Sequence, residues 1–151
     1  MPKLLKNLNI AIDLEAIVNK SITRDTPDLL HHSSYKGSLG IITLLSEVFD
    51  LYLLVPESKI KQEEILRWLK AGDINNSFRK FFTIDEKIRD IILTSSINVT
   101  ITSRKELAES LKDTTKVFYI KKKNNDSIQD GIYPIDHWKD IIKHLSFFSN
   151  T

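Results

Sequence analysis

The amino-acid sequence predicts an α/β fold of three layers, in which helices cover both faces of a mostly parallel sheet of about five strands. Two observations support this fold class. Five short apolar runs are distributed along the chain, and most are continuous rather than alternating, which is typical of strands buried on both faces. Helical patterns separate several of these runs, and this alternation indicates βαβ units. One domain is expected over residues 1–151, because this length suits one hydrophobic core.

The predicted strands are the five apolar runs themselves. Because their residues do not alternate between apolar and polar, we expect helices on both faces of the sheet. The runs are NIAI, LYLLV, DIILT, VTI and VFYI, and they cover residues 9–12, 51–55, 90–94, 99–101 and 117–120.

Four segments carry helical patterns, with apolar residues that recur every three or four positions. The second ends at Gly72, a residue well suited to follow a helix. The third opens with Ser103 and Glu106, which have the spacing of a capping box. Asp136 is the expected N-cap of the fourth. The segments are residues 38–49, 58–72, 103–111 and 136–145.

The composition excludes several classes of protein. Apolar residues make up 41% of the chain and charged residues 28%, as in an ordinary globular protein. The formal net charge of +2 gives no reason to expect nucleic acid or a membrane surface as a partner. The chain has no cysteine, which excludes disulfides, thiolate metal sites and cysteine nucleophiles. With neither a signal peptide nor an apolar run of ~20 residues, the expected location is cytoplasmic.

Polar residues follow three of the predicted strands. Asp13 stands directly after the first strand, and Glu15 follows two positions later. Ser58 lies just past the second strand, and Thr102 and Ser103 lie just past the VTI strand. Ligands of open α/β sheets bind beyond the carboxyl ends of the strands, so these side chains are expected to converge on one crevice. The alternative is that Asp13 caps a turn while the two serines cap helices.

Four stretches of the chain together resemble a known family. They are IAIDLEAIV, SSYKGSLGIITLLSEVFDLYLLVPES, IRDIILTSSINVTITSRKELAESL and YPIDHWKDIIKHL. In order and layout they are similar to the motifs of the haloacid-dehalogenase-like (HAD) superfamily of phosphatases, especially its 5′(3′)-deoxyribonucleotidase-like branch. The resemblance covers nearly the whole chain and implies the Rossmann-like HAD topology. It places the strand that ends at Asp13 in the middle of the sheet, between strands 51–55 and 99–101. The alternative is a generic open α/β sheet, and strand order separates the two.

The resemblance also implies roles for the polar residues. In the family, the first aspartate is the nucleophile that forms an aspartyl-phosphate, and the second protonates the leaving oxygen. Asp13 matches the nucleophile, which also binds Mg²⁺, and Glu15 falls at the position of the acid–base aspartate. The glutamate is one methylene longer, which alters the geometry of proton transfer. If the chain is active, the expected cofactor is therefore Mg²⁺, held in part by Asp13.

The other family motifs are replaced. Val55 and Pro56 stand where the phosphate-binding hydroxyl is expected, and Ser58 is the nearby substitute.

The replacements continue in the later motifs. Ser95 and Ser96 occupy the turn where the phosphate-binding lysine is expected, and Lys87 lies upstream of them. Thr102 and Ser103 replace the paired carboxylates that hold the metal. Neutral hydroxyls do not supply the charge of those carboxylates, and loss of one electrostatic partner costs about 10²–10³ in rate.

The resulting hypothesis is a degenerate HAD-like domain that is catalytically silent or strongly impaired. It would bind a phosphorylated small molecule or a protein partner. The alternative is an active Mg²⁺-dependent phosphatase or 5′-nucleotidase that acts through an aspartyl-phosphate on Asp13. Only about two dozen residues separate Asp13 from Gly37, so the cap over the site is expected to be minimal or absent.

Three further segments have two interpretations each. His31 and His32 are predicted to pack in a loop, with metal or acid–base roles as the alternative. Residues 121–131 are predicted to form a solvated loop, with anion binding as the alternative. FRKFF, at residues 78–82, is predicted to be a short connecting element, with a nucleic-acid surface as the alternative.

The aromatic residues of two predicted helices are expected to pack rather than to stack on a ligand. Trp68 lies beside the apolar stripe of its helix, and Trp138 lies near the start of the last one. In the tail, Phe147 and Phe148 would mark an interaction surface if they are exposed.

Overall fold

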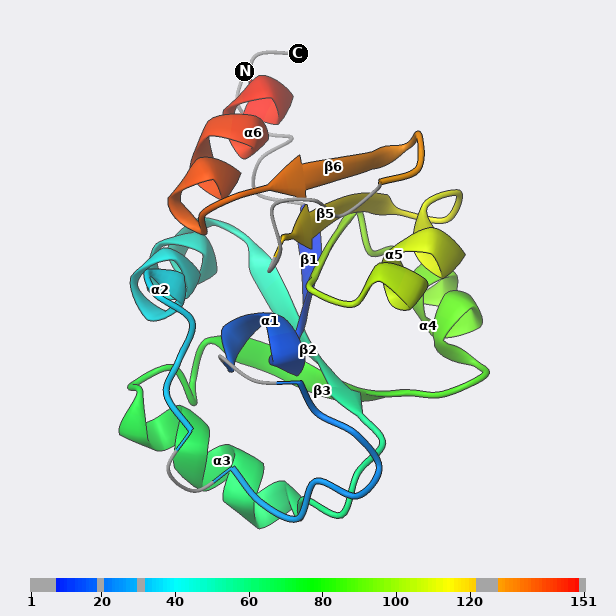
Figure 1. Cartoon of the computed structure of the whole chain (residues 1–151). Helices are drawn as coiled ribbons and strands as arrows, with labels where there is room; N and C mark the ends of the chain where they lie inside the picture. The colour runs from blue at the N-terminus through cyan, green and yellow to red at the C-terminus, as the bar shows by residue number, and fades with distance from the viewer. Residues whose placement is uncertain (1–7, 19–20, 30–31, 122–127, 150–151) are drawn as a thin grey trace.

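The protein folds into three layers around a single parallel sheet. The structure, a computed structural model, describes residues 8–18, 21–29, 32–121 and 128–149. In these residues six strands form one sheet in the order β3-β2-β1-β4-β5-β6, and every neighbouring pair is parallel (Figure 1). The strands are β1 (Asn9–Asp13), β2 (Asp50–Pro56), β3 (Phe78–Ile84), β4 (Val99–Thr102), β5 (Lys116–Ile120) and β6 (Ile132–Ile135).

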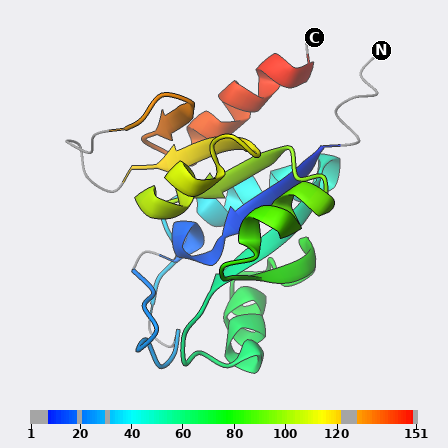
Figure 2. The same cartoon turned by 90° about the vertical axis from the view of Figure 1, so that its right-hand side faces the viewer.

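Helices cover both faces of the sheet. Buried residues of α1, α2, α3 and α6 join one apolar cluster, and those of α4 and α5 join the cluster on the opposite face. Figure 2 shows α4 and α5 on the viewer's side of the sheet, with α2 behind it. The helices are α1 (Leu14–Ile17), α2 (Ser38–Val48), α3 (Gln62–Ala71), α4 (Ile88–Thr94), α5 (Lys105–Leu111) and α6 (Lys139–Ser149). No helix in the described part of the chain is both long enough and apolar enough to cross a membrane.

The strand that leads to Asp13 lies in the interior of the sheet, as predicted. β1 pairs with β2 on one side and with β4 on the other. Ile10 and Ile12 enter one apolar cluster and Ala11 enters the other, which is the two-residue period of a strand. Both faces are therefore buried, and this explains why the run is continuously apolar. The predicted α/β class and parallel sheet are confirmed, with six strands where about five were expected.

Two predicted elements are wrong. Residues 90–94, predicted as a strand, belong to helix α4, because Ile88 and Ile92 lie one helical turn apart and face the same core. A short apolar run alone does not distinguish a strand from a buried helix. Residues 78–82, predicted as a connecting element, lie in strand β3, and strand β6 was not predicted.

The predicted capping box at Ser103 and Glu106 is also wrong. Helix α5 begins at Lys105 with Arg104 as its N-cap residue, and no side chain caps it. The buried Ser103 hydroxyl has no hydrogen-bond partner. The turn is fixed one residue earlier, because the Thr102 hydroxyl accepts a hydrogen bond of 3.0 Å from the Arg104 backbone N–H.

Two other predicted helix starts lie too early. Asp136 is not the N-cap, because β6 continues to Ile135 and α6 begins only at Lys139. The second predicted helix begins at Gln62, four residues after Ser58. Its predicted end is confirmed, since Gly72 is the C-cap residue of α3.

Trp138, just before the last helix α6, contacts the segment that follows the central strand β1. Its side chain is fully buried, and its indole N–H donates a 2.9 Å hydrogen bond to the backbone carbonyl of Ala16 in α1. Trp68 is half-buried against the same core, and its indole N–H donates to the His32 carbonyl at 2.9 Å. Both tryptophans therefore pack as predicted, and Trp138 supports the segment that follows Asp13.

We expect Trp138→Ala to lower the free energy of unfolding by about 3–5 kcal/mol, because it empties a large core site and leaves the Ala16 carbonyl without its donor. Urea unfolding followed by circular dichroism measures this change. Leu93→Ala is the control, since Leu93 is 65% exposed and its truncation should change the value by less than about 0.5 kcal/mol. Equal effects of the two substitutions would contradict the proposed role of Trp138.

Candidate functional site

Asp13 is the last residue of β1 and turns the chain into a single helical turn. Its Oδ1 accepts a 3.0 Å hydrogen bond from the backbone N–H of Glu15, so it serves as the N-cap of α1. All four residues of α1, including Glu15, are buried. The alternative that Asp13 caps a turn is therefore correct at the level of local structure.

Thr102, at the end of the neighbouring strand β4, contacts the Asp13 carboxylate. Its hydroxyl donates a 2.7 Å hydrogen bond to Asp13 Oδ2, and the Thr102 side chain is itself fully buried. The predicted convergence of these two residues is therefore present. It follows from the parallel pairing of β1 and β4, which brings their carboxyl ends to the same edge of the sheet.

Arg104 completes the cluster, although it was not among the predicted site residues. Its Nε lies 3.4 Å from Asp13 Oδ2, and a terminal guanidinium nitrogen lies 2.8 Å from Glu15 Oε2. The same guanidinium nitrogen donates a 2.7 Å hydrogen bond to the backbone carbonyl of Ile22. The Ile22 N–H in turn donates to Glu15 Oε2 at 3.0 Å. Arg104 and Glu15 thus hold the segment after α1 against the carboxylates.

This cluster excludes water from Asp13. The Asp13 side chain has no exposed surface, and Glu15 is only 7% exposed as a residue. Burial raises the pKa of Asp13 to about 6, because desolvation of the charged carboxylate outweighs its attraction to Arg104 and its hydrogen bond from Thr102. The carboxylate at the end of β1 is therefore ion-paired and enclosed.

The residues of this cluster do not fit a magnesium ion. Both oxygens of Asp13 already accept hydrogen bonds, and the Arg104 cation lies 3.4 Å from one of them. A divalent cation beside a guanidinium is repelled, and Mg²⁺ prefers carboxylate oxygens together with water or phosphate. Within residues 8–18, 21–29, 32–121 and 128–149, no group of three or more His, Cys, Asp or Glu side chains could hold a metal.

A cavity of about 700 Å³ lies next to the cluster. Ser103 lines it, and its hydroxyl is one of three buried side-chain polar atoms without a hydrogen-bond partner in the described residues, together with Ser38 Oγ and Arg104 Nε. Glu15 and Arg104 form part of the wall, as does the exposed Lys105. Lys87 is exposed at the start of α4, immediately before Ile88, which also lines this cavity.

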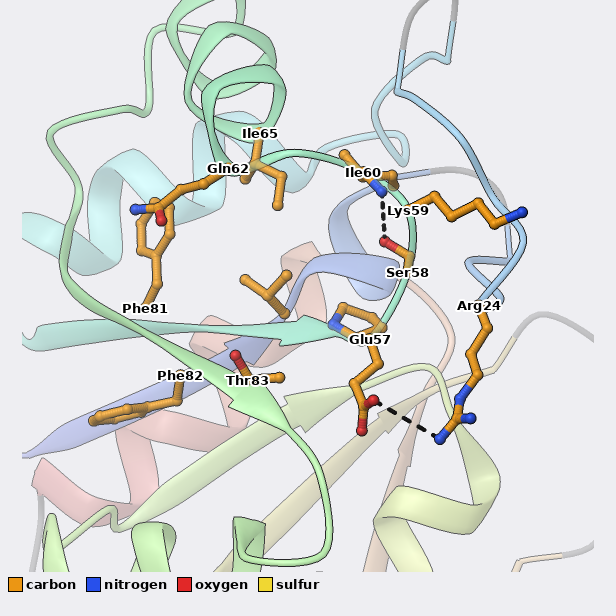
Figure 3. Close-up of a pocket in the computed structure, with 12 residues that line it drawn as sticks. Arg24, Glu57, Ser58, Lys59, Ile60, Gln62, Ile65, Phe81, Phe82 and Thr83 are labelled. Carbon is orange, nitrogen blue, oxygen red and sulfur yellow. Dashed lines mark hydrogen bonds and ion pairs between the residues drawn. The ribbon is translucent and has the colours of Figure 1, made fainter.

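Ser58 lines a different cavity. β2 passes beside Asp13 at Leu54, so Ser58 lies four residues further along the chain. Its hydroxyl accepts a 3.2 Å hydrogen bond from the Ile60 N–H, and it faces a cavity of about 560 Å³ between β2, β3 and α3 (Figure 3). A phosphate-binding role for Ser58 stays a prediction.

Ser95 and Ser96 lie at the other end of the central strand. The Asn9 side-chain amide, at the start of β1, donates a 3.1 Å hydrogen bond to the Ser96 carbonyl. A strand of five residues spans roughly 13 Å, so these serines are far from Asp13. The structure does not bring them into the crevice in which they were expected.

The segment between α1 and α2 contains little regular structure where it is described. Val18 and Ser34 form an isolated antiparallel bridge. His32 is half-buried near Trp68, whereas His31 and residues 122–127 of the predicted polar loop lie outside the described residues. The side chains of Phe147 and Phe148 also lie outside the described part. The minimal cap and the anion-binding loop therefore stay predictions.

The fold is shared with known phosphatases. No family model matches the chain, and no curated protein matches it. Among solved structures, a D,D-heptose bisphosphate phosphatase from B. bronchiseptica, complexed with magnesium and phosphate, is similar with a TM-score of 0.70 and 11% identity. The similarity covers 93% of this chain and 99% of that chain.

Two other solved structures share this fold. The core domain of a candidate phosphoglycolate phosphatase from Streptococcus pneumoniae has a TM-score of 0.62 and 13% identity, covering 95% of this chain and 98% of that one. A haloacid dehalogenase-like family hydrolase from Xanthomonas campestris has a TM-score of 0.57 and 7% identity, covering 79% of this chain and 57% of that one. At these identities the comparisons show that the chain shares the fold of these proteins, and no more.

The raised pKa of Asp13 predicts a specific dependence of stability on pH. The native state binds the Asp13 proton more tightly than the unfolded chain does, so this group lowers the free energy of unfolding as pH rises from about 4 to about 6. The expected loss is about 3 kcal/mol as an order of magnitude. Urea unfolding of the wild type and of Asp13→Asn over this range measures it, because contributions of other groups cancel in the difference. A difference that does not change between pH 4 and pH 6 would contradict the assignment.

Proposed function

We propose that this chain is a non-catalytic domain with a phosphatase-type fold, in which Asp13 and Glu15 belong to an internal ion cluster with Arg104 and do not transfer phosphate. One observation carries the proposal: the Arg104 guanidinium lies against both carboxylates. A metal-dependent aspartate nucleophile needs an accessible oxygen and a bound cation. Here the cation is a side chain of the protein itself, and the aspartate is fully buried.

The environment of Glu15 also supports the proposal. A general acid must be able to reach the leaving group of a substrate. Glu15 Oε2 instead accepts from the Ile22 N–H and contacts Arg104, and both partners lie within 3.0 Å. This carboxylate is therefore engaged in holding the chain after α1.

For such a domain the remaining role is binding. We propose that it binds a phosphorylated ligand or a protein partner, in the cytoplasm. The cavity beside Ser103 supports the first option, because Arg104 and Lys105 line it together with a buried hydroxyl that has no partner. Of the two basic residues, only Lys105 is exposed, so a ligand would meet it first.

The second candidate is an Mg²⁺-dependent phosphatase or 5′-nucleotidase. Asp13 ends a central strand of a fold that a magnesium-bound phosphatase shares, which favours this candidate. It requires Arg104 to leave both carboxylates before any substrate or metal approaches. The nucleotidase-like branch of the resemblance makes nucleoside monophosphates the substrates to try.

Hydrolysis assays separate the two candidates. We expect no release of phosphate above the Asp13→Asn background from an aryl phosphate or a panel of nucleoside monophosphates, with Mg²⁺, Mn²⁺ or Co²⁺ present. The physical reason is that both Asp13 oxygens are engaged and enclosed. Turnover by the wild type that disappears in Asp13→Asn would establish the enzyme and overturn the proposal.

Arg104 itself provides a second test. We expect Arg104→Ala to lower the free energy of unfolding by about 3–5 kcal/mol, because it leaves two buried carboxylates without their cation. Arg104→Lys, the matched control, keeps the charge but loses the two-pronged geometry and should fall between the wild type and Arg104→Ala. Urea unfolding measures both.

The same variants test whether Arg104 occupies the place that a metal ion would take. Millimolar Mg²⁺ should leave the thermal midpoint of the wild type unchanged and raise that of Arg104→Ala, since the carboxylates are then open to another cation. Differential scanning fluorimetry with Mg²⁺ or EDTA gives this comparison. An Mg²⁺-induced increase of similar size in the wild type would show that Arg104 does not occupy the place of a metal.

A further inference from the structure

The two edges of the sheet differ in how well they are protected. β6 forms one edge with only four residues, and its third residue, Pro134, has no N–H to offer to another strand. β3 forms the other edge with seven residues and no proline (Figure 1). An edge strand presents unpaired N–H and C=O groups to any chain that can lie beside it. β3 is therefore the more available edge.

Only part of β3 is regular. Leu51 of β2 pairs with Phe78, but the next residue, Tyr52, pairs with Lys80, so Arg79 is an extra residue that forms a bulge. Bulges are one means by which proteins block an edge. Beyond the bulge, residues 80–84 pair one to one with β2 without interruption. This stretch of five residues is the regular part of the edge.

The cavity that Ser58 lines reaches this same stretch. Phe81, Phe82 and Thr83 all line it, and its volume is about 560 Å³. Figure 3 shows Phe81 directed from β3 toward Gln62, and Phe82 directed to the opposite side of the strand. Val55, Ile60 and Ile65 give the cavity an apolar part. A strand added beside β3 would therefore find a recess for one of its apolar side chains.

The charge of the edge selects the partner. The charged residues of β3 are Arg79 and Lys80, both cations and both exposed. Arg79 pairs with Asp50 at 2.6 Å, while the Lys80 ammonium lies 5.7 Å above the Phe82 ring. A second copy of β3 would add a further Arg79 and Lys80 to the edge and would offer no carboxylate from the strand to pair with them. A strand that carries carboxylates would instead be attracted.

We propose that residues 80–84 bind an extended, acidic segment of a partner protein, which adds to the sheet beside β3 and inserts an apolar side chain into the cavity lined by Phe81. Main-chain hydrogen bonds would supply affinity, and the cavity and Lys80 would supply selectivity. This surface is separated from Asp13 by β2, so the proposal does not depend on whether Asp13 is catalytic.

The test uses synthetic nine-residue peptides in which aspartate or glutamate alternates with valine, isoleucine or phenylalanine. A matched set has lysine in place of each acidic residue. Binding is followed by two-dimensional amide NMR of the whole chain. We expect the acidic set to shift the amide signals of residues 80–84 and to leave those of β6 unchanged. N-methylation of alternate peptide amides should weaken binding about tenfold, because it removes main-chain donors.

Charge reversal on the protein gives the second arm. Lys80→Glu should weaken the acidic peptides roughly five- to tenfold, since an attraction becomes a repulsion. Lys139→Glu is the matched control, because Lys139 is exposed on α6 and the substitution changes the net charge equally. The amide spectrum of each variant without peptide verifies that it is folded.

Several results would overturn the proposal. These are the absence of amide shifts at residues 80–84 with every acidic peptide, equal binding of the acidic and lysine sets, and equal effects of Lys80→Glu and Lys139→Glu. Sedimentation that shows a dimer of the chain, lost in Lys80→Glu, would assign the edge to a second copy instead.

Discussion

The contact between Arg104 and two buried carboxylates is the constraint on which the centre of this structure depends. Asp13 and Glu15 have almost no contact with water, and a buried carboxylate without a cation is strongly destabilising. One guanidinium lies against both and also donates to the Ile22 carbonyl, although for Asp13 its attraction is smaller than the cost of desolvation. The Arg104 side chain thereby connects four parts of the chain: the end of β1, the single helical turn α1, the segment after α1, and the turn between β4 and α5. The planar, forked shape of arginine permits this combination, and a lysine ammonium would not reproduce it.

The same contact limits the chemistry of the site. A phosphate ester would have to attract Arg104 away from two carboxylates, and its own negative charge would then face them uncompensated. Thr102, in the position where the resemblance implies a carboxylate, donates a hydrogen bond to Asp13 and adds no negative charge. The negative charges of Asp13 and Glu15 thus face a balancing cation that the protein itself supplies, Arg104. In a phosphatase of the resembling family, that balance is completed by metal and substrate, so the two arrangements are alternatives.

Much of this architecture follows from the sequence, and the failures have physical causes. The central position of β1 and the meeting of Asp13 with Thr102 follow from apolar runs and parallel pairing. The error at residues 90–94 had a further consequence. A strand there would have placed Ser95 and Ser96 at its carboxyl end, but the segment is α4, and the serines therefore precede β4 at the opposite end of the sheet. Arg104 was missed because a single cation in a turn has no periodic pattern, and its partner Glu15 lies 89 positions earlier.

The distribution of accessible groups follows from these constraints. At the carboxyl edge of β1 and β4, Asp13, Thr102 and Arg104 contact one another, so little remains there for an external molecule except the cavity beside Ser103. The two edge strands of the sheet differ from this central site and from each other. β6 is short and interrupted by Pro134, whereas β3 retains five regular residues and an adjoining cavity. The side chains of β3 pack against both apolar clusters, but its outer main-chain groups face no further strand of the described sheet. We therefore expect recognition at the edge strand β3, which β2 separates from the ion pair.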